Sequence, residues 1–116
     1  NGTCLYSYQE FIHLLDGLGP QVGYLLDVGH ATLNGWNPVT AVQDLAERLF
    51  ALHLHDNDGV ADRHLPIGAG VISWDALLEE IAHLPDTVNL VLEYNFDAPL
   101  EHLQEGKRML QIRLSL

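Results

Sequence analysis

Three short apolar runs, separated by helix-like patterns, constrain the fold of this chain more than any other feature. They cover residues 23–27 (GYLLD), 50–55 (FALHLH) and 88–93 (VNLVLE), and each is typical of a strand inside a sheet. Strands that alternate with helices are joined by right-handed crossovers and form a parallel sheet. The sequence therefore predicts an α/β fold. Because three strands would leave two apolar edges unpaired, both a small open domain and part of a barrel fit the pattern.

Helix-start signals precede each expected helix and support this alternation. The signals are the capping box of Ser7 and Glu10, the Asn37-Pro38 pair, Ser73, and the Asp97-Ala98-Pro99 run. A long loop rich in Gly and Asp is expected over residues 56–72. The predicted order of elements is αβαβαβα.

The composition narrows the class of protein and its partners. The 116 residues fit one domain, and 47% apolar content is enough for a core. A formal charge of −11 argues against nucleic acid as a partner, because phosphates are bound chiefly by Lys and Arg. No apolar run approaches the roughly 20 residues of a membrane span, so no membrane association is expected. The single Cys4 excludes an internal disulfide, which favours a cytoplasmic protein.

Each predicted strand carries a side chain that can bind a metal ion at or near its carboxyl end. These side chains are Asp27, His53 and Glu93. Parallel strands open their carboxyl ends to one edge of the sheet, so the three side chains are expected to converge there. Taken singly, each residue is more often a helix cap, a core group or half of an ion pair. Two carboxylates and an imidazole on three successive strands favour a site for a divalent metal, Mn²⁺, Zn²⁺ or Mg²⁺.

Further candidates surround these three residues. His30 follows Asp27 closely and is expected on a loop above the strand, where it could bind substrate hydroxyls or ligate a neighbouring ion. Asp62 and His64 lie together in the long loop and could take part in an additional metal site.

Other polar residues receive lesser roles. His55 and Asp56 are expected to orient His53 from outside the ligand set. The histidines within helical patterns are expected at the surface; they are His13, His83 and His102.

Three motifs together resemble one known family. GYLLDVGH, then LHLHDND-x₃-DRHLPIGAG-x-I-x-W, then LVLEYN are similar to the C-terminal half of a xylose isomerase-like TIM barrel. This superfamily includes sugar phosphate isomerases and epimerases, inosose dehydratases, and the family 2 apurinic (AP) endonucleases. The resemblance implies that the three strands are strands six to eight of such a barrel.

The resemblance assigns roles to the strand-end residues. It implies that Asp27, His53 and Glu93 are metal ligands and that Glu93 is also the catalytic general base. A fourth ligand, a Glu on the fifth strand, has no counterpart here, and Asn1-Gly2-Thr3 resembles the run that follows it. Residues 1–116 are therefore expected to form a single partial (half) TIM-barrel domain, a fragment of a longer chain.

The resemblance also assigns roles around the strand ends. It implies that His30 contacts substrate in epimerases or ligates a further metal in endonucleases. Asp62 and His64 match the pair that completes the additional zinc site of the endonucleases. Arg63 matches a substrate-binding Arg of some epimerases.

Three functions follow as hypotheses. The first is a metal-dependent sugar isomerase or epimerase that transfers a proton through a metal-stabilised enediolate, with a sugar or sugar-like small molecule as substrate. This chain alone is expected to be weak or inactive as an enzyme. The second is a zinc-dependent apurinic endonuclease. The third is a non-catalytic half-barrel that self-associates as a homodimer through its open edges. The sequence selects neither the sugar nor the metal.

Overall fold

The computed structural model contains one parallel sheet, as the sequence predicts. It describes residues 6–116, so Asn1-Gly2-Thr3 and Cys4 lie outside the described residues. The strands are β1 (Tyr24–Asp27), β2 (Leu49–Leu54) and β3 (Asn89–Leu92), paired in the order β1-β2-β3. Both pairings are parallel, which confirms the α/β fold class.

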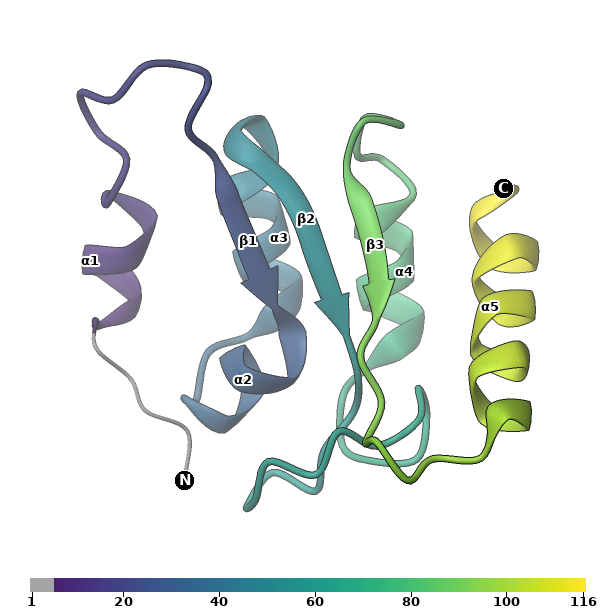
Figure 1. Cartoon of the computed structure of the whole chain (residues 1–116). Coiled ribbons are helices and arrows are strands. Elements are labelled where there is room, and N and C mark those ends of the chain that lie inside the picture. Colours follow the sequence, from purple (N-terminus) through teal and green to yellow (C-terminus); the bar gives the residue numbers. More distant parts are fainter. Residues whose placement is uncertain (1–5) are drawn as a thin grey trace.

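The helices lie between and beside these strands (Figure 1). They are α1 (Tyr8–Ile12), α2 (Val28–Leu33), α3 (Pro38–Leu45), the short 3₁₀ helix η1 (Ala46–Arg48), α4 (Trp74–Ile81) and α5 (Leu100–Leu114). Among the described residues, no helix is both long enough and apolar enough to cross a membrane.

The capping predictions are confirmed at two helices. Ser7 and Glu10 form the reciprocal capping box of α1. The Asn37 side chain accepts hydrogen bonds from the first turn of α3. Ser73 precedes α4, but its side chain makes no capping hydrogen bond.

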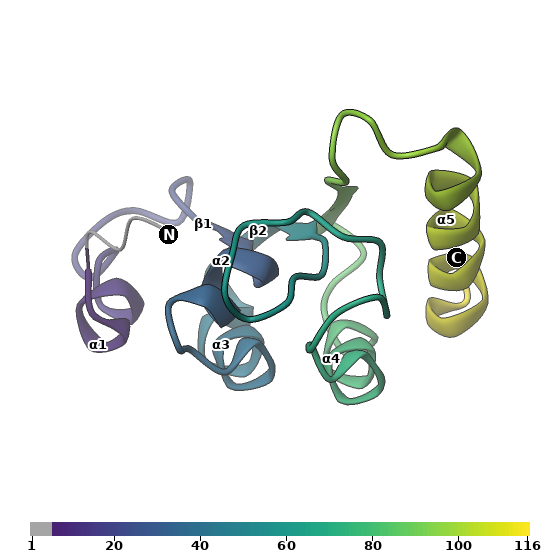
Figure 2. The ribbon, with the colours of Figure 1, turned by 90° about the horizontal axis from the view of Figure 1, so that it is seen from below.

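The core lies on one side of the sheet, where α3 and α4 pack (Figures 1 and 2). Leu52 and Leu54 of β2 are fully buried and belong to one apolar cluster with residues of both helices. Val42 of α3 and Leu77 of α4 are among the members of this cluster that have almost no exposed area. Burial of this face fixes which side of each strand points away from the helices, because successive residues of a strand alternate.

The opposite face of the sheet is open, with no described helix covering it (Figure 2). Its apolar side chains are half exposed: Leu25 at 50%, Phe50 at 48% and Val91 at 41%. Phe50 is the additional residue of a register shift, because Tyr24 pairs with Leu49 but the next residue, Leu25, pairs with Ala51.

Helix α2 was not predicted, and it corrects the placement of His30. The sequence predicted a loop after β1, but the helix begins directly after Asp27. The Asp27 carboxylate caps it by accepting the backbone N–H of His30 at 2.8 Å. His30 therefore lies in the first turn of a helix, which fixes its backbone.

Candidate metal centre

The carboxyl ends of the strands bring Asp27, His53 and Glu93 together. Asp27 is the register partner of His53, and Glu93 extends the β2–β3 ladder by donating its N–H to Leu54 O at 3.1 Å. His53 Nδ1 lies 2.7 Å from Glu93 Oε2 and 3.9 Å from Asp27 Oδ2. We call these three residues the strand-end cluster.

Asp27 uses its two carboxylate oxygens differently. Oδ1 accepts the N–H of His30 and a hydrogen bond from His55 Nε2 at 2.9 Å, whereas Oδ2 lies 3.2 Å from His30 Nδ1 and 3.9 Å from His53 Nδ1. Burial alone would raise the pKa of Asp27, but the hydrogen bonds from His55 and His30 and the charge of both rings lower it. The carboxylate is therefore held ionised with one oxygen facing the cluster.

Glu93 has an unsatisfied atom that bears on metal binding. Its Oε2 is buried and has no hydrogen-bond partner among the described residues. The short contact to His53 Nδ1 is an ion-pair distance without hydrogen-bond geometry, so it does not satisfy this oxygen. A buried carboxylate oxygen without a partner is costly, and a coordinated cation would remove the cost. The donor set therefore fits a divalent metal ion.

A second group, which we call the Asp62 cluster, contains His30, Asp62 and His64. Asp62 lies between the two rings, with Oδ2 3.0 Å from His30 Nε2 and Oδ1 3.1 Å from His64 Nε2. Burial alone would raise the pKa of Asp62, but the hydrogen bond from His30 and the neighbouring histidine charges lower it. A nitrogen and a carboxylate oxygen this close need a proton or a cation between them, so this cluster also fits a metal.

The prediction that His55 and Asp56 orient His53 was wrong, because the side chains of both residues bind other partners. β2 ends at Leu54, so strand alternation does not extend to His55. The fully buried His55 ring contacts Asp27 rather than orienting His53. Its ring stacks on His64, with centroids 3.9 Å apart and planes 9° from parallel. Burial would lower the pKa of His55, but the hydrogen bond and charge of Asp27, with smaller contributions from Asp56 and Asp62, raise it.

Asp56 organises the long loop instead of acting on His53. The buried carboxylate accepts five hydrogen bonds, from the backbone N–H groups of Asn57, Gly68, Gly70 and Ile72 and from Trp74 Nε1. The backbone of Asp56 also pairs with Leu65 in an isolated antiparallel bridge. These bonds fold the loop back on itself and so place the Asp62 cluster beside the strand ends. The sequence gives no local signal for them, because most of the donors lie more than ten residues away.

Arg63 lies in the same loop, but its guanidinium pairs with Asp58 at 3.0 Å and its side chain is 59% exposed. The predicted contact of Arg63 with substrate stays a prediction. His13, His83 and His102 are exposed, as predicted.

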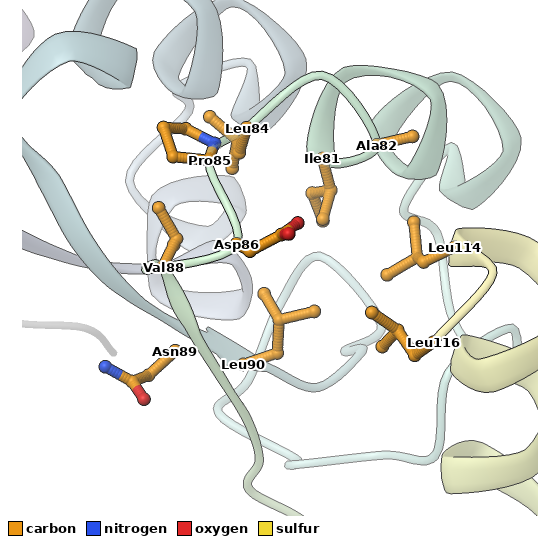
Figure 3. A pocket seen from close by; sticks show the side chains of 10 residues that line it. All are labelled: Ile81, Ala82, Leu84, Pro85, Asp86, Val88, Asn89, Leu90, Leu114 and Leu116. Atoms are coloured by element: carbon orange, nitrogen blue, oxygen red, sulfur yellow. The ribbon is translucent and has the colours of Figure 1, made fainter.

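A hollow of about 330 Å³, lined by both apolar and polar side chains, lies at the other end of the strands (Figure 3). Its labelled side chains include Val88 and Leu90 of the β3 region and Leu114 and Leu116 at the end of the chain. Because these lie at the amino end of β3, the hollow is not part of the metal-competent clusters.

Comparison with known proteins agrees with this architecture. The family described as "Xylose isomerase-like TIM barrel" matches residues 1–113. The chain therefore belongs to the xylose isomerase-like TIM-barrel family. A crystal structure of a D-tagatose 3-epimerase-like protein superposes with a TM-score of 0.75 over 92% of this chain and 40% of that one, at 24% identity. That similarity shows the fold.

Curated relatives share part of the sequence. An uncharacterized protein of Sinorhizobium fredii, y4fM, is 34% identical over 80 residues, which are 69% of this chain and 24% of that protein. The rhizopine catabolism protein MocC of Rhizobium meliloti is 33% identical over 85 residues, 72% of this chain and 26% of MocC. An uncharacterized protein of Methanocaldococcus jannaschii, MJ1311, is 36% identical over 66 residues, 54% of this chain and 22% of MJ1311. The chain thus spans about a quarter of the length of these relatives.

Proposed function

We propose that this chain carries the metal-binding and proton-transfer residues of a sugar isomerase or epimerase. The observation that carries the proposal is the convergence of Asp27, His53 and Glu93, with a Glu93 oxygen that has no other described partner. Membership of the xylose isomerase-like family supports a small sugar or sugar-like substrate. We propose Mn²⁺, Zn²⁺ or Mg²⁺ as the ion, because two carboxylates and one imidazole suit all three.

The residues at the strand ends are proposed to have separate roles in the reaction. A bound divalent ion would polarise adjacent carbonyl and hydroxyl oxygens of the sugar. Glu93, 40% exposed at the side chain, would take a proton from the carbon next to the carbonyl as general base. His30 and Arg63 are proposed to hold substrate hydroxyls, since both side chains are partly exposed at this edge of the sheet.

The open sheet face limits what the chain is expected to do alone. Leu25 and Val91 are exposed on that face, so a sugar bound at the strand ends would have water on one side. Excluding water is part of how such sites strengthen electrostatic interactions. We therefore expect this half-barrel to bind the ion and to be weak or inactive in sugar conversion.

Metal titration of the purified chain tests the proposal. We expect one Mn²⁺ ion to bind at the strand-end cluster. Asp27→Asn and Glu93→Gln should each weaken binding by more than the roughly 10- to 100-fold that loss of an outer hydrogen-bond partner costs. His83→Gln, at an exposed helical position, is the matched control and should bind as the unchanged chain does. Equal affinity in all four proteins would overturn the proposal.

The Asp62 cluster favours a second candidate, a zinc-dependent apurinic endonuclease. Asp62 lies within 3.1 Å of both His30 and His64, an arrangement that could hold an additional ion. The charge of −11 opposes DNA binding by this chain. One ion per chain would favour sugar chemistry, and more than one would favour the nuclease. Self-association through the open edges of β1 and β3 stays a separate prediction, which light scattering tests.

A further inference from the structure

His55 occupies the junction between the two clusters. Its side chain has no exposed area, its Nε2 lies 2.9 Å from Asp27 Oδ1, and its ring stacks on His64. The strand pattern does not predict a fully buried imidazole at this position. A buried imidazole beside carboxylates is itself a candidate metal ligand. His55 belongs to two groups of side chains whose potential ligand atoms all lie within 4.8 Å of one another. One group is His30, His55, Asp62 and His64, and the other is Asp27, His55 and Glu93.

The stacking argues against His55 sharing an ion with His64. An imidazole binds a metal through a lone pair that lies in the plane of its ring. Two rings that stack 3.9 Å apart and only 9° from parallel have lone pairs in two parallel planes. Such lone pairs do not converge on one ion, so only one of the two rings can serve the Asp62 cluster. His64 Nε2 faces Asp62 at 3.1 Å and is therefore the better candidate.

The hydrogen bonds argue against His55 as a ligand of the strand-end cluster. Its Nε2 donates to Asp27 Oδ1, and its Nδ1 lies 3.3 Å from the backbone carbonyl oxygen of Asp56. Both ring nitrogens thus face oxygens that accept hydrogen bonds. To bind an ion through Nε2, the nitrogen that faces the strand-end cluster, His55 would have to give up the bond that holds Asp27.

That bond decides which oxygen of Asp27 faces the ion. Oδ1 is occupied by the His30 N–H at 2.8 Å and by His55 Nε2. With Oδ1 held from two directions, rotation of the carboxylate is restricted, and Oδ2 is left 3.2 Å from His30 Nδ1 and 3.9 Å from His53 Nδ1. Outer partners that hold a ligand in this way commonly govern metal affinity.

The backbone of α2 is shaped to admit the His55 ring. A Cβ atom at Gly29 would lie 2.1 Å from a carbon atom of the ring, which leaves no room for any side chain there. The His55 ring can therefore pack against α2 only because residue 29 is a glycine.

We propose that His55 is a positioning residue, which fixes the Asp27 carboxylate for metal binding. The inference rests on the proposed metal site and adds to it a residue outside the ligand set.

Two amides that differ by one methylene group test the proposal. In His55→Gln the amide NH₂ can reach the position of imidazole Nε2 and donate to Asp27, whereas in His55→Asn it is too short. The probe is Co²⁺ alone, titrated into the purified chain and followed by its visible absorption. We expect His55→Asn to bind Co²⁺ about 10- to 100-fold more weakly and His55→Gln to bind within about threefold of the unchanged chain, with the same spectrum. Thermal unfolding without metal shows whether each variant is folded, and His83→Gln serves as the control.

Each outcome has one meaning. If the unchanged chain does not bind Co²⁺, the proposed function fails, and with it the basis of this inference. If the unchanged chain binds but His55→Asn binds equally well, His55 does not position Asp27. If folded His55→Gln loses as much affinity as His55→Asn, or its spectrum changes, His55 is a ligand and the proposal is wrong. Should His55→Asn fail to fold, Gly29→Ala displaces the ring without altering it and supplies the weakened variant.

Discussion

His64 Nδ1 lies 2.8 Å from the backbone carbonyl oxygen of Glu93. A carbonyl oxygen only accepts hydrogen bonds, so Nδ1 carries the proton and donates it. The loop after β2 and the end of β3 are thus joined beside both clusters, and the backbone N–H of Asn95 reinforces the joint by donating to His64 O at 3.0 Å. The backbone of His64 has a φ of 46°, an uncommon conformation that this joint stabilises.

His64→Asn separates the two functions of this residue. The amide nitrogen of Asn can take the place of Nδ1 and donate to Glu93 O, but Asn has no atom in place of Nε2. We expect the strand-end ion to bind as before and any second Zn²⁺ ion to be lost, as measured by zinc content after dialysis. His64→Ala removes both contacts and should also lower the unfolding temperature. Retention of two zinc ions in His64→Asn would contradict the ligand role of Nε2.

Stability of the metal-free chain should depend on pH in two ranges. Asp27 and Asp62 have lowered pKa values, so their contribution is complete above their ordinary value of 3.8 and is lost as the pH falls through the lowered pKa. His55 has a raised pKa, so its contribution is complete below its ordinary value of 6.5 and is lost as the pH rises through the raised pKa. Urea unfolding in the presence of a chelator should show greatest stability between these ranges. In His55→Gln, most of the loss of stability above pH 6.5 should disappear. If the variant loses stability above pH 6.5 as the unchanged chain does, this would count against the His55–Asp27 pair.

Asp56→Asn tests the loop anchor. The substitution keeps the shape but replaces an oxygen that accepts hydrogen bonds by an NH₂ group that faces N–H donors. We expect the free energy of unfolding to fall by about 3 kcal/mol, since buried donors are left without an acceptor. Asp97→Asn, at an exposed position, is the control and should change stability by less than about 0.5 kcal/mol. Equal stability of both variants would show that the loop does not depend on Asp56.

Leu25 and Leu26 are neighbours in β1 with opposite environments. Leu26 is 2% exposed in the core, whereas Leu25 is 50% exposed on the open face. Leu26→Ala should cost about 3 kcal/mol in chemical unfolding, because it removes core contacts and leaves a cavity. Leu25→Ala should cost less than about 1 kcal/mol. A similar cost at both positions would mean that the open face is covered in solution.

The strands and the strand-end cluster could be predicted because both depend on local pattern. Apolar runs mark the strands, and the shared edge of a parallel sheet brings Asp27 and His53 into register. Helix α2 was not predicted, although Asp27 directly precedes it and Asp is a strong helix cap. The contacts of His55 and Asp56 could not be predicted, because each joins segments that are distant in sequence.

Because Asp27 caps α2 through Oδ1 and faces the cluster through Oδ2, one carboxylate connects the start of a helix to the candidate ion site. Ion binding would hold that carboxylate more firmly, and the first turn of α2 would then open less often. Amide hydrogen exchange at His30, whose N–H is bonded to Asp27, should therefore slow when the site is filled. The helix cap would act as a built-in reporter of metal occupancy, readable without any substrate.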